Sequence, residues 1–168
     1  FITVPWQEDP KKKNPVHYYR KEFKADQKIK SARVYATAYG VYDVSINGKK
    51  VGNRELAPGW TSYEHRLKYQ TYNADGLLTK GANCISIRLA QGWAQGRIAL
   101  RAKPEKWQEN LAILFELHIE YANGETKVIK TDDSWKVSTG GLVEATIYDG
   151  EVFDLSLEPV NWQKSGFN

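Results

Sequence analysis

The chain of 168 residues contains no methionine and only one cysteine, Cys84. A single cysteine excludes an intrachain disulfide, so a disulfide-stapled scaffold is ruled out. Cys84 begins the alternating stretch 84–89, which predicts a buried thiol in a strand rather than a nucleophile. Because exported proteins can also lack disulfides, the cellular compartment stays open. The missing initiator methionine and the absence of a signal peptide in residues 1–6 indicate a piece of a longer chain.

Long hydrophobic runs and metal-ligand spacings are also missing. No apolar stretch is long enough to cross a bilayer, so we expect no membrane partner. The three histidines, at positions 17, 65 and 118, are scattered and lack the spacing of a zinc site. The net charge of +4 comes largely from lysines in residues 11–13 and 24–30. Without a concentrated basic stripe, we expect no nucleic-acid partner.

Helical periodicity is almost absent, and only residues 74–79 resemble a single helical turn. The clearest pattern is the alternation from Ile113 to Tyr121, in which apolar odd positions face away from mostly polar even ones. Asn47-Gly48 and Asn123-Gly124 are typical of two-residue hairpin turns. Further strands are expected at residues 16–23, 31–38, 41–46, 65–72, 83–90, 125–130 and 151–157.

Short strands with regular turn signals predict an all-β fold, an antiparallel β-sandwich or jelly roll. A chain of this length can bury its own core as one domain. We therefore expect a single domain over residues 1–168, in which residues 1–15 form an extended lead-in to the first strand.

Aromatic and glycine residues recur at turn-like positions between residues 40 and 97. Trp60 follows the stiff pair Pro58-Gly59, and Trp93 lies in the segment 92–97, which ends in Arg97. An aromatic ring held by a short turn can stack on the apolar face of a sugar, and a nearby arginine can bind the sugar hydroxyls. Tryptophans of a sandwich also serve as core plugs, so both roles stay open for Trp60 and Trp93.

Asp149 and Glu151 are the best candidates for a pair of catalytic carboxylates. On a regular strand, positions i and i+2 share a face at a separation of about 6–7 Å, near the lower limit for inverting glycosidases. Gly150 between them indicates a bulge or turn, which favours solvated or interface-forming carboxylates over catalysis. No cofactor is predicted; calcium remains an option because loops at 73–75, 132–133 and 149–151 offer oxygen ligands.

The chain resembles the N-terminal β-sandwich domain of bacterial α-L-rhamnosidases, glycoside hydrolase family 78. The segments that carry the resemblance are 38–42, 46–52, 56–63, Arg66, 69–72, 81–83, 92–93 with 96–97, 132–135 and 148–154. They occur in the expected order and extend over most of the chain. The resemblance implies a carbohydrate-binding-module-like sandwich that is a fragment of a larger multidomain enzyme. Ala94, where the family often has an aromatic residue, weakens a two-ring platform.

The resemblance also implies a role. In this family, the catalytic carboxylates lie in a separate downstream (α/α)-barrel, so none of the residues of this chain is expected to be catalytic. We expect a non-catalytic accessory domain that helps to bind rhamnose-containing glycans or positions the barrel that hydrolyses terminal α-L-rhamnose. A purely structural module without sugar affinity is the alternative. The residues expected to contact sugar or the catalytic domain are Trp60, Tyr63, Arg66, Trp93, Arg97, Asp149 and Glu151.

Overall fold

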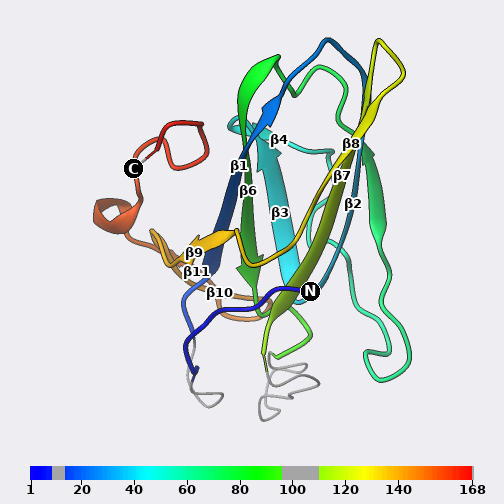
Figure 1. Cartoon of the computed structure of the whole chain (residues 1–168). Helices are drawn as coiled ribbons and strands as arrows, with labels where there is room; N and C mark the ends of the chain where they lie inside the picture. Colours follow the sequence, from blue (N-terminus) through cyan, green and yellow to red (C-terminus); the bar gives the residue numbers. More distant parts are fainter. Residues whose placement is uncertain (9–13, 96–109, 168) are drawn as a thin grey trace.

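Two antiparallel sheets face each other across the main hydrophobic core (Figure 1). The computed structural model describes residues 1–8, 14–95 and 110–167. All the pairings between strands in this described part are antiparallel. The predicted all-β antiparallel sandwich is therefore confirmed.

The first sheet has five strands in the order β4-β3-β6-β1-β9. Their bounds are β1 His17–Ala25, β3 Val41–Ile46, β4 Lys49–Lys50, β6 Gly81–Ala90 and β9 Lys136–Ser138. The second sheet has four strands in the order β5-β2-β7-β8. Their bounds are β2 Ile29–Tyr39, β5 Gln70–Asn73, β7 Ala112–Tyr121 and β8 Thr126–Lys130. A separate two-stranded sheet, the β10–β11 hairpin, consists of β10 Leu142–Thr146 and β11 Gly150–Phe153, and a 3-10 turn, η1, follows at Leu155–Leu157.

Strand β7 supplies many of the large side chains of the core. Its odd positions from Ile113 to Tyr121 are all buried, as the alternation predicts. The neighbouring strand β2 turns mostly small residues inward, with Ala36 opposite Phe115 and Ala38 opposite Ile113. Large side chains on one strand thus lie beside small ones on the next, an arrangement that suits close packing against the facing sheet.

Both predicted hairpins are present. Asn47 and Gly48 have φ values of 53° and 78°, which are the left-handed values required by a type I′ turn between β3 and β4. Gly124, with a φ of 86°, turns the chain between β7 and β8. The Asn47-Gly48 turn thus matches the twist of β3 and β4, and the second hairpin is closed by the Gly124 N–H, which donates to the Tyr121 carbonyl at 2.9 Å.

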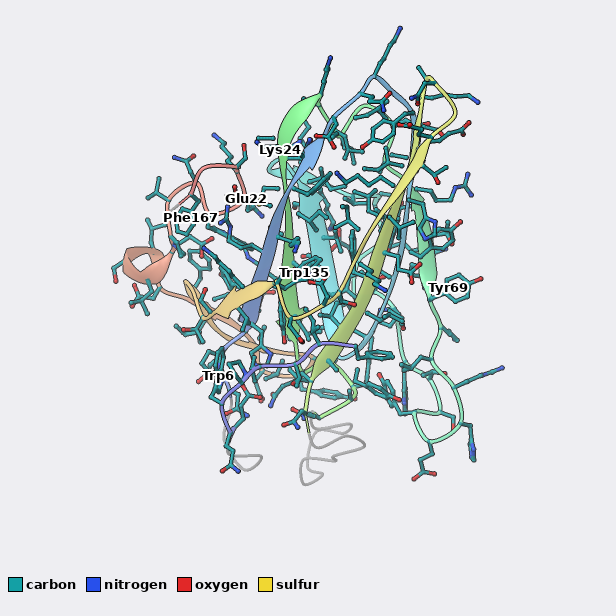
Figure 2. All side chains as sticks on the ribbon, viewed as in Figure 1. Trp6, Glu22, Lys24, Tyr69, Trp135 and Phe167 are labelled. Atoms are coloured by element: carbon teal, nitrogen blue, oxygen red, sulfur yellow. The ribbon has the colours of Figure 1, made fainter. Side chains whose placement is uncertain are left out.

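The C-terminal segment forms a third layer outside the sandwich. Residues 154–167 lie beside β1 on the outer face of the five-stranded sheet, together with the β10–β11 hairpin (Figure 1). A small second apolar cluster holds this layer, with Val16, Tyr18 and Trp162 as its buried members. Phe167 also lies on this outer side, whereas Trp135 lies between the sheets and packs against Phe115 (Figure 2).

Three of the expected elements differ from the structure. The strand expected at residues 65–72 begins only at Gln70, because the N–H groups of His65 and Arg66 both donate to the Ser62 carbonyl in a turn. The helical turn expected at 74–79 is a non-helical turn, since Gly76 with a φ of 75° stops helical progression. The strand expected at 151–157 ends at Phe153.

That strand ends because the Asp154 carboxylate accepts hydrogen bonds from the Ser156 N–H and hydroxyl and caps the 3-10 turn η1. Strands β9 and β10 were not expected. Both are short and only partly buried, so they lack a clear alternation. Within the expected lead-in, Ile2 forms a β-bridge to Ile113, and residues 9–13 lie outside the described part. In the described part of the chain, no helix has the length and apolar character needed to cross a membrane.

Candidate functional site

Trp60 is the most exposed tryptophan of the described chain, with 52% of its surface accessible. The turn before it is closed by the Gly59 N–H, which donates to the Leu56 carbonyl at 2.9 Å, and Gly59 has a φ of 89°. Trp60 borders a shallow hollow of about 450 Å³ that residues 60–64 line. A flat apolar ring at the edge of a hollow is suited to stacking on a sugar ring.

Tyr63 supports this loop from below. It is 4% exposed, and its ring lies 6.2 Å from the ring of Tyr39. Its hydroxyl is buried and has no hydrogen-bond partner among the residues that the structure describes. Burial raises the pKa of Tyr63 to about 12. The ring of Tyr63 therefore packs, and its hydroxyl stays protonated across the physiological range.

The other predicted positions are spread over the molecule. The Arg66 side chain is exposed and does not border the hollow of Trp60. Trp93 is half-buried in a turn closed by a hydrogen bond from the Ala94 N–H to the Gln91 carbonyl at 3.2 Å. Arg97 lies outside the described residues. The structure thus brings Trp60 and Tyr63 together and leaves Arg66 and Trp93 apart from that hollow.

Asp149 and Glu151 lie at the tip of the β10–β11 hairpin. Gly150 between them has a φ of 80°, and the Asp149 N–H donates to the Thr146 hydroxyl at 2.9 Å. The predicted turn at Gly150 is therefore present. Both carboxylates are exposed, so no apolar pocket encloses the pair as the general acid of a glycosidase requires.

Glu151 borders a second hollow, which we call the hairpin groove. It lies between the β10–β11 hairpin and the outer face of β3 and β6, and its volume is about 440 Å³. Its charged lining residues are Asp43, Glu55, Arg88 and Glu151, and most of the other lining residues are apolar. The apolar residues include Val16, Leu56, Leu142 and Phe153.

Glu158 is an important site residue that sequence reasoning missed. Its carboxylate accepts hydrogen bonds from the Tyr18 hydroxyl at 2.8 Å and the Trp162 indole at 3.0 Å, and it pairs with Arg88 at 2.6 Å. The Gly141 N–H also donates to it at 3.0 Å. Burial alone would raise its pKa, but these donors outweigh burial and hold the pKa of Glu158 below its usual value.

The Glu158 cluster fixes the guanidinium of Arg88 at the floor of the hairpin groove. Arg88 lies over the ring of Tyr18 at 5.0 Å and over that of Trp162 at 5.6 Å. The polar positions Ser86 and Arg88 on an otherwise apolar strand were the available sequence signal, because they mark the outer face of β6. The partner Glu158 is 70 residues away in the chain, so spacing could not reveal it.

Four exposed apolar side chains lie in β11 and in the segment that follows it in the sequence. We call these residues the apolar strip: Val152, Leu155, Leu157 and Val160. Their exposed fractions are 51%, 79%, 54% and 79%. All four lie within nine residues of the sequence, and exposed apolar surface is typical of contact surfaces when it is contiguous.

Two of the loops named for calcium use a carboxylate in a local hydrogen bond. The Asp75 carboxylate accepts the Ala32 N–H at 2.7 Å, and that of Asp132 accepts the Ser134 N–H at 3.0 Å. Among the described residues, no group of three or more histidine, cysteine or acidic side chains could hold a metal ion. Calcium binding stays a prediction, which the titrations with and without calcium described below test.

Comparison with known proteins adds family information to this geometry. The family model described as "Alpha-L-rhamnosidase N-terminal domain" matches residues 27–168. An α-L-rhamnosidase from Streptomyces avermitilis is 35% identical over 165 residues, which is 98% of this chain and 16% of that protein. The chain thus spans about one sixth of the length of this curated relative.

Solved structures agree with the sequence match. The native α-L-rhamnosidase of Aspergillus terreus superimposes with a TM-score of 0.93 at 37% identity and covers 99% of this chain and 19% of its own. The Streptomyces avermitilis enzyme, solved in complex with L-rhamnose, has a TM-score of 0.89 at 36% identity and covers 93% of this chain and 15% of its own.

Proposed function

The chain belongs to the family of α-L-rhamnosidase N-terminal domains, and we propose that it is a non-catalytic accessory module that docks against the remainder of a longer rhamnosidase chain. In this proposal, docking orients the module beside the catalytic domain that hydrolyses terminal α-L-rhamnose. The apolar strip is the observation that carries the proposal.

Exposure in the strip is too large to be incidental. Leu155 and Val160 are each 79% exposed and lie five residues apart in the sequence, and Val152 and Leu157 are about half exposed. Covering one such side chain stabilises a contact by about 1.5–3 kcal/mol, so four of them offer a strong local driving force. The rigid anchoring of residues 158–167 to β1 would transmit the position of the docked strip to the whole sandwich.

A test compares the double variant Leu155→Ser/Val160→Ser with the control Val128→Ser in the full-length enzyme. Val128 lies on β8 of the four-stranded sheet and is 48% exposed. It is therefore an exposed apolar residue like those of the strip, but it is not part of the strip. We expect the strip variant to unfold in two steps, in which the module melts separately from the remainder of the enzyme, or to show a first unfolding transition that is several degrees lower than in the wild type. Indistinguishable melting of all three proteins would exclude docking through the strip.

A second candidate function is sugar contact at Trp60, which the exposed ring and its adjoining hollow favour. Titration of the chain with L-rhamnose, with and without calcium, would report it through tryptophan fluorescence and amide shifts. We expect Trp60→Ala to abolish the response and Trp93→Ala, which changes a half-buried ring, to serve as the comparison. A saturable response unaffected by Trp60→Ala would exclude this site.

A further inference from the structure

A third hollow lies between the outer face of β1 and β9 and the C-terminal segment, and the docking proposal does not use it. We call it the C-terminal pocket. Its volume of about 390 Å³ falls within the range of about 300–1,000 Å³ typical of small-molecule sites. It is lined from both sides, by residues of the two strands and by residues 159, 162 and 167.

The apolar wall of the C-terminal pocket is mainly aromatic. Trp162 and Phe167 line it from the C-terminal segment, and Tyr18 lines it from β1. The rings of Tyr18 and Trp162 pack on each other with their centroids 4.7 Å apart. Pro159 and Val137 add further apolar lining. A flat ring of a ligand can make favourable contacts with such a wall.

The aromatic side chains are fixed before any ligand arrives. The Arg20 guanidinium donates to the main-chain carbonyls of Trp162 and Phe167, both at 3.2 Å, and lies over the Phe167 ring at 5.2 Å. The Trp162 indole donates to the Glu158 carboxylate at 3.0 Å. Because these groups are already ordered, ligand binding costs less conformational entropy.

The charged side chains described in the lining are both cations, Arg20 and Lys136. Lys136 lies opposite Arg20 in the strand register, so the two side chains share the outer face. Arg20 is paired with the Glu22 carboxylate at 2.5 Å. Lys136 is exposed, acts on Glu22 only at longer range, and forms no ion pair within the described part of the chain.

The ammonium of Lys136 is therefore free to bind an anion, because Arg20 already neutralises Glu22. The hydroxyls of Ser138 and Thr139 belong to the same lining and can donate hydrogen bonds to that anion. An aromatic wall beside an ammonium favours a ligand that has both a flat ring and a negative charge. We propose that the C-terminal pocket binds a small aromatic carboxylate, with its ring against the aromatic wall and its carboxylate at Lys136.

Three ligands that share one ring system test this inference. 2-Naphthoate, 2-naphthamide and 2-naphthylmethylammonium carry a carboxylate, a neutral amide and an ammonium on the same two rings. We expect 2-naphthoate to cause saturable amide shifts in residues 136–139 and 162–167. The amide should bind at least about threefold more weakly, as the loss of an exposed ion pair predicts, and the ammonium compound more weakly still. Acetate, which has the charge without the rings, should cause no saturable shifts.

One variant of each wall and one control locate the binding. Lys136→Gln removes the ammonium, Phe167→Leu replaces the flat ring, and Lys130→Gln changes an exposed lysine of β8 in the other sheet. We expect Lys136→Gln to weaken 2-naphthoate binding at least about threefold and to leave 2-naphthamide binding unchanged. Phe167→Leu should weaken both, and the control neither. Unchanged thermal unfolding of each variant confirms that the fold is intact.

The outcomes separate this pocket from the other surfaces. Equal binding of 2-naphthoate and 2-naphthamide, or no saturable response to 2-naphthoate, would overturn the proposal. Shifts that keep their affinity in Lys136→Gln and vanish in Trp60→Ala would also overturn it and would locate the ligand at Trp60. The melting comparison of the apolar strip is independent of these results, so docking and ligand binding can fail separately.

Discussion

Glu158 lies 2.6 Å from Arg88 and thereby joins the C-terminal segment to the middle of the five-stranded sheet. The two residues come from η1's C-terminal flank and from β6. Their side chains are 18% and 32% exposed, so water screens the pair only in part. This contact is the centre of the outer layer that frames the hairpin groove.

Replacement of Glu158 by glutamine should destabilise the protein in a pH-dependent way. The variant lacks the negative charge that accepts hydrogen bonds from Arg88 and the other donors to Glu158. We therefore expect the free energy of unfolding to fall by about 1–3 kcal/mol at pH 7. Because the pKa of Glu158 is lowered in the folded state, its contribution is present above the ordinary value of 4.5 and is lost as the pH falls through the folded value. Urea unfolding of the wild type and the variant at pH 7 and at pH 3 measures the loss of stability and its dependence on pH.

The stability gap between wild type and Glu158→Gln should therefore shrink towards pH 3. Glu144→Gln, a half-buried carboxylate of β10, is a control on the hairpin itself. A gap that stays constant with pH would mean that the charge of Glu158 contributes nothing.

Arg20 should anchor the end of the chain. Its guanidinium donates to three backbone carbonyls, those of Trp162 at 3.2 Å, Lys164 at 2.9 Å and Phe167 at 3.2 Å. We expect Arg20→Gln to raise amide hydrogen exchange in residues 162–167 at least about tenfold and to shift Trp162 fluorescence to the red. Arg33→Gln, an exposed position on β2, should change neither. Unaltered exchange in the Arg20 variant would refute the anchoring role.

Gly40 should tolerate no side chain. It has a φ of 137°, and a Cβ there would lie 2.5 Å from the carbonyl oxygen of Ala90. Gly124 has a φ of 86° with nothing within 4 Å of the same position. Gly124→Ala should therefore cost only the backbone strain of about 1–3 kcal/mol, and Gly40→Ala about 1–3 kcal/mol more. Thermal unfolding ranks the two, and equal losses would contradict the steric argument.

Tyr63→Phe should leave stability unchanged or raise it by up to about 1 kcal/mol, because the buried hydroxyl has no partner in the described structure. Tyr63→Ala should instead cost about 3–5 kcal/mol, since it removes a buried ring. Chemical denaturation distinguishes the two. A marked loss in the phenylalanine variant would show that the hydroxyl is hydrogen-bonded in solution.

Much of the sandwich could be predicted from the sequence, because a strand buried on one face must alternate. The alternation from Ile113 to Tyr121 and the Asn47-Gly48 pair are local sequence patterns, and each predicts its structure without reference to distant residues. The outer layer could not be predicted in this way. Arg20 and Glu158 bind atoms that lie far away in the chain, several of them backbone carbonyls, and these leave no periodic pattern.

The candidate site was predicted in part for the same reason. Trp60 was recognised because Pro58-Gly59 fixes the turn before it locally, and the structure does expose its ring. Glu151 was singled out as one of a carboxylate pair, whereas it borders a groove with Arg88 of another strand. The groove exists only because the hairpin folds over β3 and β6, which is a tertiary relationship.

The three carbonyls that Arg20 holds belong to the main chain, so these three hydrogen bonds do not depend on the identity of the side chains at positions 162, 164 and 167. Lys164 could become almost any other residue without loss of its link to the sheet. Main-chain hydrogen bonds of this kind hold position 164 against the sheet while its exposed side chain stays open to substitution.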